Sequence, residues 1–378
     1  MKKALLMTPG PSQVPPQVLQ AMAEPIFHHR TAEYKELQSE VTERLKRIFF
    51  SSGEVVVLAA SGTGAMEASV VNVLGGGRKG LSLEGGKFGQ RWGDICQAFG
   101  YECERVEIEW GKAANPAVVA ERLAANKSIA AVYATLVETS TGVENDIRAI
   151  GEAVAGTDAI LVVDGISGAG GSELRFDDWG VDILVVGSQK ALMMPPGLAL
   201  AVVSEKARKL IETADRQAYY FDLKKALDKA ADSDTPYTPA NTLVRALATS
   251  LRMIEGEGIE AVFARHRLLA EAMRAGAQAL GMKIFAERPA AVVTAIELPE
   301  SIDGSALSKL LEKKFAVKVA GGQEHLKGRI LRVAHMGYCS PSDVIVALSA
   351  LEMALAELGA KVEPSAAVKA AEAVFARA

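Results

Sequence analysis

Two hydrophobic patterns alternate along the first half of the chain. Short, nearly continuous runs of apolar and β-branched residues are typical of strands covered on both faces, whereas apolar residues that recur every three or four positions are typical of helices. The runs of the first kind are 55–60, 79–85, 129–135, 159–165, 181–189 and 197–205. The helical segments between and before them include 18–26, 31–50, 65–74 and 89–99. This alternation predicts an α/β fold with a mostly parallel sheet sandwiched by helices.

The pattern changes after about residue 204. Residues 204–242 are more polar and end in the turn-rich DSDTPYTPAN, so we expect a connection on the surface or at an interface. Residues 243–280 are strongly helical, with a break expected near Gly256 and Gly258. Further strands are expected at 290–299, 316–322 and 328–336, followed by helix to the end. We therefore expect an N-terminal arm (1–15), a large domain (16–250) and a smaller α+β domain (251–378).

Composition narrows the class of protein. The chain has 378 residues, enough for two or three domains, and a formal net charge of -4, which gives no basic field for nucleic acid. Its three cysteines, Cys96, Cys103 and Cys339, lack the spacing of a disulfide framework or a zinc site. The longest apolar stretch is interrupted by prolines and is too short to span a bilayer. We expect a cytoplasmic protein without metal, nucleic-acid or membrane partners.

A lysine follows an expected strand in VDILVVGSQKALMMPPG. Burial at that place would disfavour the ammonium form of Lys190 and leave an amine that can attack an aldehyde. The alternative is a lysine at a strand end that extends its charge into solvent. The segment alone leaves both interpretations open.

An aspartate ends the strand AILVVDG, at the carboxyl edge where open α/β sheets bind ligands. A carboxylate at Asp164 could pair with a pyridine nitrogen and keep it protonated, which lets the ring accept electron density. A turn-forming or helix-capping aspartate before Gly165 is the alternative.

Small residues at Ser61, Gly62, Thr63 and Gly64 stand between an expected strand and an expected helix. Backbone N–H groups and hydroxyls at the positive end of a helix suit a phosphate. A tight turn without a ligand is the alternative. A dinucleotide fingerprint is disfavoured, because Glu67 replaces the third glycine of G-x-G-x-x-G.

Two further residues could bind a small ligand. Arg332 lies among apolar residues in GRILRVAHMG, where its guanidinium is costly to bury without a partner, and its planar fork fits a carboxylate. The alternative is a structural ion pair. Phe88, in EGGKFGQRWGD, could lie flat on an aromatic ring or could simply be a core residue.

Taken in order, these motifs resemble the class V aminotransferases of the fold-type I pyridoxal-phosphate enzymes, nearest to the alanine–glyoxylate and serine–glyoxylate group. The resemblance runs through TPGPSQVPP, SGTGAMEA, FGQRWGDI, ETSTGVEND, LVVDGISGAGG, VDILVVGSQKALMMPPG and LRVAHMG. It implies pyridoxal 5'-phosphate as the cofactor, and a large domain with a seven-stranded, mostly parallel sheet beside a smaller C-terminal domain.

The resemblance also implies a role for each matching residue. Lys190 would form the Schiff base with the cofactor and shuttle the proton, and Asp164 would pair with the pyridinium nitrogen. Ser61, Gly62, Thr63 and Gln189 would lie at the phosphate, Phe88 and Ile166 on the two ring faces, and Thr139 near the ring hydroxyl. Gly10 and Arg332 would contact the substrate, Arg332 through the substrate carboxylate. Phe88 departs from the family pattern, because close relatives carry Trp there.

Members of this family are dimers with each site at the interface. Tyr237 and Thr238, in TPYTPAN, match the segment that the other subunit contributes to the site. We therefore expect a homodimer with shared active sites.

The expected reaction is a ping-pong transamination from alanine or serine to a 2-oxo acid such as glyoxylate. One cationic fork at Arg332 suffices for a small monocarboxylate. A dicarboxylate or phosphorylated substrate would need another cation, which His28, His29 and Arg30 could supply if they face the site. A surface turn or a structural ion pair is the alternative for that cluster.

Other class V reactions remain alternatives: phosphoserine, aminoethylphosphonate or ureidoglycine transamination, or desulfurase and lyase chemistry. Desulfurases resemble a pattern with a stacked His and a reactive Cys on a late loop, whereas Phe88 occupies the stacking place here and Cys339 lies seven residues past Arg332. A NAD-dependent dehydrogenase would leave Lys190 without a role. A non-catalytic relative is disfavoured by the joint presence of Lys190, Asp164 and Arg332.

Overall fold

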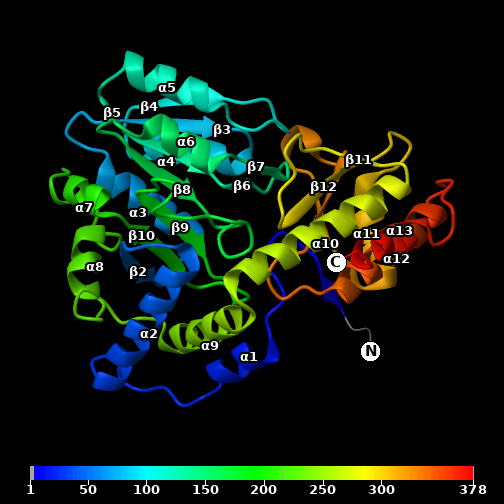
Figure 1. Ribbon diagram of the computed structural model, residues 1–378, viewed down its shortest axis with the longest axis horizontal. Helices are drawn as coiled ribbons and strands as arrows, with labels where there is room; N and C mark the ends of the chain where they lie inside the picture. Colours follow the sequence, from blue (N-terminus) through cyan, green and yellow to red (C-terminus); the bar gives the residue numbers. More distant parts are fainter. Residues whose placement is uncertain (1–3, 216, 378) are drawn as a thin grey trace.

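The computed structural model describes residues 4–215 and 217–377 and is organised around a seven-stranded sheet (Figure 1). Its strands, in spatial order, are β2 (Glu54–Leu58), β10 (Ala199–Val203), β9 (Ile183–Gly187), β8 (Ile160–Asp164), β5 (Ile129–Thr135), β3 (Lys79–Glu84) and β4 (Cys103–Glu107). Only β10 runs antiparallel to its neighbours within this sheet. The predicted mostly parallel sheet is therefore confirmed.

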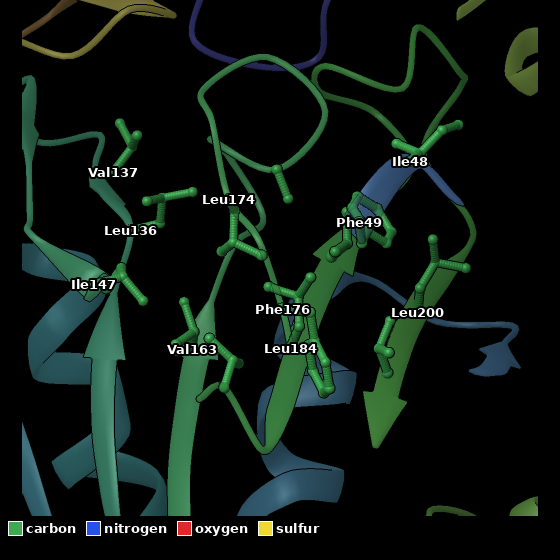
Figure 2. Packing of buried hydrophobic residues seen from close by; sticks show 14 of the residues in the cluster. Ile48, Phe49, Leu136, Val137, Ile147, Val163, Leu174, Phe176, Leu184 and Leu200 are labelled. Carbon is green, nitrogen blue, oxygen red and sulfur yellow. The ribbon is translucent and has the colours of Figure 1, made fainter. Parts of the chain in front are cut away.

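Side chains alternate between two hydrophobic cores, one on each face of the sheet. Val163 of β8 and Leu184 of β9 pack on one face, where Figure 2 shows them with Phe49 and Ile147. Val162 and its neighbours on adjacent strands pack on the opposite face. Both faces are covered, which explains why these strands read as continuous apolar runs.

Helices form the outer layers. The first core is covered by α2 (Ala32–Phe49), α5 (Pro116–Ala125), α6 (Ile147–Val154) and α9 (Asn241–Glu257), with α1 (Pro16–Met22) against α9. The second core is covered by α3 (Gly62–Val73), α4 (Lys87–Ala98), α7 (Glu205–Glu212) and α8 (Leu223–Ala230). None of the helices among the described residues is both long and apolar enough to cross a bilayer.

The prediction for residues 204–242 was wrong in part. This polar segment holds two helices, α7 and α8, rather than connection alone. Each buries one narrow apolar edge, Ala207 with Ile211 and Leu223 with Leu227, and exposes its charged residues. Helices this short contribute too few apolar positions to reveal their period in the sequence.

A second, antiparallel sheet of four strands has the order β11 (Lys283–Ile284), β12 (Val293–Glu297), β15 (Ile330–Ala334) and β14 (Ala320–Gly321). It packs with α10 (Ile259–Ala279), α11 (Gly304–Phe315), α12 (Pro341–Glu357) and α13 (Ala366–Phe375) around a core of its own. The expected helix break falls at Gly258, between α9 and α10, and Figure 1 shows α10 leading toward this second group of elements. The domain limits 1–15, 16–250 and 251–378 remain a prediction.

The start of the chain joins the second group of elements. Strand β1 (Leu5–Leu6) pairs in parallel with β13 (Val317–Lys318), and Ala334 N donates to Met7 O at 2.8 Å. The segment that follows, residues 8–12, then reaches the loop after β9, where Ser12 N donates to Gln189 O at 2.9 Å. The N-terminal segment thereby covers the carboxyl edge of the large sheet.

Candidate active site

A cavity of about 280 Å³ opens at the carboxyl ends of β2, β8 and β9. This is the edge at which open α/β sheets bind ligands, because the loops of parallel strands converge there. Nine of the residues singled out from the sequence line it: Gly10, Ser61, Gly62, Thr63, Phe88, Asp164, Ile166, Gln189 and Lys190. Pro11, Arg91, Ser167 and Pro196 complete the wall.

Lys190 is buried in this cavity, with 8% of its surface exposed. Its Nζ donates to the carbonyl oxygen of Pro9, and its own carbonyl accepts from Ser12 Oγ at 2.7 Å. Burial lowers the pKa of Lys190 to about 8; nearby Asp164 opposes the shift, and Arg332 and Arg91 add to it. A solvent-seeking lysine is therefore excluded, and about a tenth of the amine is neutral at pH 7.

Asp164 ends β8 and is also buried. Its Oδ1 accepts from Ile166 N at 2.8 Å, which is a turn-type contact, but no helix begins there among the described residues. Burial raises the pKa of Asp164 to about 7; the bond from Ile166 opposes this rise. The carboxyl group thus lies where a cationic ligand nitrogen would favour its ionised form.

Helix α3 begins at Gly62 and points its first turn at the cavity, with Ser61 as the N-cap residue. Ser61 makes no capping bond, so its hydroxyl is available. A Cβ atom on Gly62 would lie 2.5 Å from Ile166 Cδ1, so the Ile166 side chain packs directly against the first turn of the helix. Gln189 also lines the cavity, and its side-chain N–H₂ group is a hydrogen-bond donor. These groups form a cradle suited to a phosphate.

Phe88 lies in the first turn of α4 and is half-buried at the cavity. The guanidinium of Arg91 lies over its ring, 4.9 Å from the centroid, and donates to Thr63 Oγ1 at 3.1 Å. Arg91 lies within the motif FGQRWGDI, but the sequence alone predicts no role for it. An arginine on an amphipathic helix reads as solvent-facing, so only the fold reveals that it enters the cavity.

Arg332 and Thr139 lie just behind the wall rather than on it. Arg332 is buried on β15, where Nε donates to Gly321 O at 2.9 Å and Nη1 to Thr139 O at 3.0 Å. It forms no salt bridge with any described residue, so the structural ion pair is not found. The Thr139 hydroxyl lies 2.6 Å from the Ser167 hydroxyl, and Ser167 faces the cavity.

Two predicted groups lie away from this cavity in the same chain. Tyr237 and Thr238 line a different hollow beside β2, and the Tyr237 ring stacks on Tyr220 at 5.2 Å between centroids. The cluster His28, His29 and Arg30 is a surface turn whose arginine pairs with Asp234 and donates to Thr235 O at 2.8 Å. Within one chain, the cluster is therefore a surface turn with an ion pair and does not supply a second cation to this cavity.

The sequence is similar to that of a known protein family and of several named relatives. The model of the family described as Aminotransferase class-V matches residues 4–340. An uncharacterized aminotransferase of Methanocaldococcus jannaschii is 42% identical over 96% of this chain and 95% of its own length. A serine–glyoxylate aminotransferase of Hyphomicrobium methylovorum is 35% identical (98% and 94% covered), and an L-aspartate–glyoxylate aminotransferase of Paracoccus denitrificans is 34% identical (97% and 95% covered).

The fold agrees with these matches. The crystal structure of the ureidoglycine–glyoxylate aminotransferase of Bacillus subtilis superposes with a TM-score of 0.94 at 30% identity, covering 100% of this chain and 99% of that one. The similarity therefore extends over both sheets and the cavity at the edge of the larger one.

Proposed function

Since the chain belongs to the aminotransferase class-V family, we propose that it moves the amino group of a small monocarboxylate, alanine or serine, to a 2-oxo acid such as glyoxylate. It is a pyridoxal-phosphate-dependent transaminase. One observation carries the proposal: a single cavity holds a buried lysine, a buried carboxyl and a phosphate cradle. Glyoxylate is favoured because the names of three similar proteins share it.

The residues present fit pyridoxal 5'-phosphate. Ser61, Gly62, Thr63 and the side-chain N–H₂ group of Gln189 would hold the phosphate, and Asp164 would face the ring nitrogen. Phe88 and Ile166 would lie on opposite ring faces, with Thr139 acting through its contact to Ser167 near the ring hydroxyl. When bound, the cofactor supplies an aldehyde that takes up the amino group and a ring that accepts electron density from the substrate Cα.

Lys190 has the properties of both the attachment point and the proton carrier. Its lowered pKa leaves Nζ able to attack a carbonyl carbon and later to take the proton from the substrate Cα. Gly10 leaves room for this movement, because a Cβ atom there would lie 2.4 Å from Lys190 Cε. With a cationic ring nitrogen beside it, Asp164 would stay ionised while the proton moves.

Arg332 would bind the substrate carboxylate. Its guanidinium is oriented by two backbone carbonyls and is not neutralised by a salt bridge with a described residue, so it can pair with an incoming anion. One such fork matches alanine, serine and glyoxylate, which carry one carboxylate each.

A second candidate is a dicarboxylate donor such as aspartate, favoured by the additional cation Arg91 in the cavity. The hydrogen bond from Arg91 to Thr63, however, places the Arg91 guanidinium beside the phosphate cradle, where it would bind the cofactor and not the substrate. We therefore rank the monocarboxylate first. An Arg91→Gln variant separates the two: weaker cofactor binding supports the first, and a rise in KM for aspartate alone supports the second.

We further propose that the enzyme is a homodimer that shares its sites, and that it resides in the cytoplasm, where its three free cysteines remain reduced. Ile26, Tyr219 and Tyr220 expose large apolar surfaces; Ile26 is two residues from His28, and the two tyrosine rings contact the ring of Tyr237. A second subunit would cover them and bring Tyr237 and Thr238 to its partner's cavity. Light scattering should give about twice the mass of one chain, and Tyr237→Phe should weaken cofactor binding.

The decisive experiment is a panel of half-reactions. The purified holoenzyme is mixed with alanine, serine, aspartate, phosphoserine, aminoethylphosphonate or cysteine, and loss of the visible absorbance of the lysine-bound cofactor is followed. Alanine and serine should react fastest, and glyoxylate should restore the absorbance. A tenfold preference for aspartate, a phosphorylated donor or sulfide release from cysteine would replace the proposed specificity.

A further inference from the structure

A buried glutamate lies behind the cavity and does not line it. Glu138 ends β6 (Val137–Glu138), and only 2% of its surface is exposed. Its Oε2 accepts from Phe88 N at 3.1 Å and Gly89 N at 2.8 Å, and its Oε1 accepts from Ser140 N at 3.0 Å and Ser140 Oγ at 2.5 Å. A buried carboxylate is tolerated only with such donors, so Glu138 and its partners fix one another.

The first of these links caps helix α4. The N-cap residue, Gly86, offers no side chain, so the first N–H groups of the helix need external acceptors. Glu138 supplies one to Phe88 and Gly89, and Ser140 Oγ accepts from Lys87 N at 3.0 Å. A Cβ atom on Gly86 would lie 2.5 Å from Glu138 Cδ, so Glu138 packs directly against the start of α4. The ring of Phe88 and the side chain of Arg91 depend on that start.

The second link reaches the other sheet. Thr139 lies between Glu138 and Ser140; its carbonyl oxygen accepts from Arg332 Nη1, and its hydroxyl is hydrogen-bonded to the Ser167 hydroxyl. Glu138 is also the negative charge that opposes the burial-lowered pKa of Arg332. The segment 138–140 therefore contacts the start of α4, which carries Phe88, on one side and the Arg332 guanidinium on the other.

We propose that Glu138 is a positioning residue for both the Phe88 ring and the Arg332 guanidinium. Its side-chain carboxylate would thereby align the cofactor, through Phe88, and the carboxylate of the substrate, through Arg332. This inference rests on the proposed function of Phe88 and Arg332. It implies a distinctive defect: disturbing Glu138 should weaken cofactor binding and substrate binding at once, whereas disturbing Arg332 should affect substrate binding only.

The test compares Glu138→Gln with Glu144→Gln in the full-length protein. The control, Glu144, lies on β7 (Val143–Glu144), which pairs with β6, and its Oε2 accepts from Ser172 Oγ at 2.6 Å, but it does not line the cavity. Glutamine keeps the shape of Glu138 but turns an N–H₂ group toward backbone donors. We expect Glu138→Gln to raise both the Kd for pyridoxal phosphate and the KM for the amino donor about tenfold or more.

The two constants are measured separately. The Kd comes from titrating the cofactor-free protein, followed by tryptophan fluorescence and by visible circular dichroism of the bound cofactor, and needs no turnover. The Glu144→Gln protein should match the wild type in both constants. A Glu138→Gln protein with wild-type Kd, dichroism and KM would overturn the inference, whereas a wild type that transaminates none of the donors would instead refute the proposed function.

A milder variant guards against misfolding. Ser140→Ala removes the hydroxyl that bridges Glu138 and Lys87 N but leaves the carboxylate in place. It should raise the Kd for the cofactor a few-fold and leave the KM nearly unchanged, because the bond from Arg332 goes to Thr139 O. An unchanged Kd in a folded Ser140→Ala protein would contradict the capping role.

Discussion

The two sheets present their functional side chains in different ways. On the seven-stranded sheet, Asp164 is the last residue of its strand and Lys190 lies just beyond the end of β9, so both project from the edge. On the four-stranded sheet, Arg332 stands in the middle of β15, with both strand neighbours buried. The large sheet therefore presents Asp164 and Lys190 at its edge, whereas the small sheet presents Arg332 from the middle of a strand.

The chemical consequence differs in the same way. Burial moves the pKa values of Asp164 and Lys190 toward neutrality, to about 7 and about 8, so that both can change charge during a reaction. Burial also lowers the pKa of Arg332, but a guanidinium remains charged at any physiological pH. The large sheet should thus govern bond making and proton transfer, and the small sheet should govern binding.

The strongest test of this division is Lys190→Ala. Loss of the amine should reduce transamination by at least about 10³-fold and abolish borohydride-stable attachment of the cofactor. Turnover and mass spectrometry of the reduced protein measure both effects. Lys209→Ala, on the exposed side of α7, is the control and should behave as wild type. Normal turnover without Lys190 would sink the assignment.

Asp164→Asn should lower kcat by about 10²- to 10³-fold, because the ring nitrogen loses its anionic partner. The same change should stabilise the cofactor-free protein. A carboxyl whose pKa is raised on folding costs stability as the pH rises from its unfolded value through about 7, and asparagine carries no such cost. Melting curves at pH 8 should show a higher Tm for the variant, and the gain should vanish near pH 4.

Arg332→Ala should raise the KM for amino donor and 2-oxo acid by about 10- to 100-fold while the Kd for the cofactor changes little. Arg329→Ala is a matched control, because this arginine is exposed and directly precedes β15. An unchanged KM would mean that another residue binds the carboxylate and that the division between the two sheets fails.

A pH dependence is also expected. Attachment of pyridoxal phosphate to the cofactor-free protein needs neutral Lys190, whose pKa is about 8, so its rate should rise up to tenfold per unit below pH 8 and level off above it. Ionisation of Asp164 near pH 7 should steepen the lower part. Stopped-flow absorbance measures this profile, and a rate that falls with rising pH between 6 and 8 would contradict it.

Much of the large sheet could be predicted because its strands are buried on both faces. Strand β5 coincides with the expected 129–135, and β8 and β9 fall within their expected runs. Strand β4 was missed because it is an edge strand, CERVE, whose side chains are half-buried or exposed and mostly polar. The pattern of hydrophobic residues reflects burial, so an element that buries few side chains is hard to recognise in the sequence.

The site divides along a similar line. Asp164, Lys190 and the Ser61–Thr63 turn were found because strand ends of a parallel sheet converge, and the structure brings them into one cavity. Glu138 could not be found, because its donors come from a helix about fifty positions earlier in the chain. Arg91 was missed because its role depends on which way α4 faces. The roles of Tyr237 and Thr238 remain predictions, since they concern a second subunit.

The N-terminal segment has a practical consequence for anyone who purifies this enzyme. Its first strand, β1, is held by β13, and the chain contacts Lys190 through Pro9, three residues after that strand ends, and through Ser12. An affinity tag fused before β1 would therefore pull on the backbone that touches the reactive amine. A tag placed after α13, none of whose residues lines the cavity, leaves that backbone undisturbed.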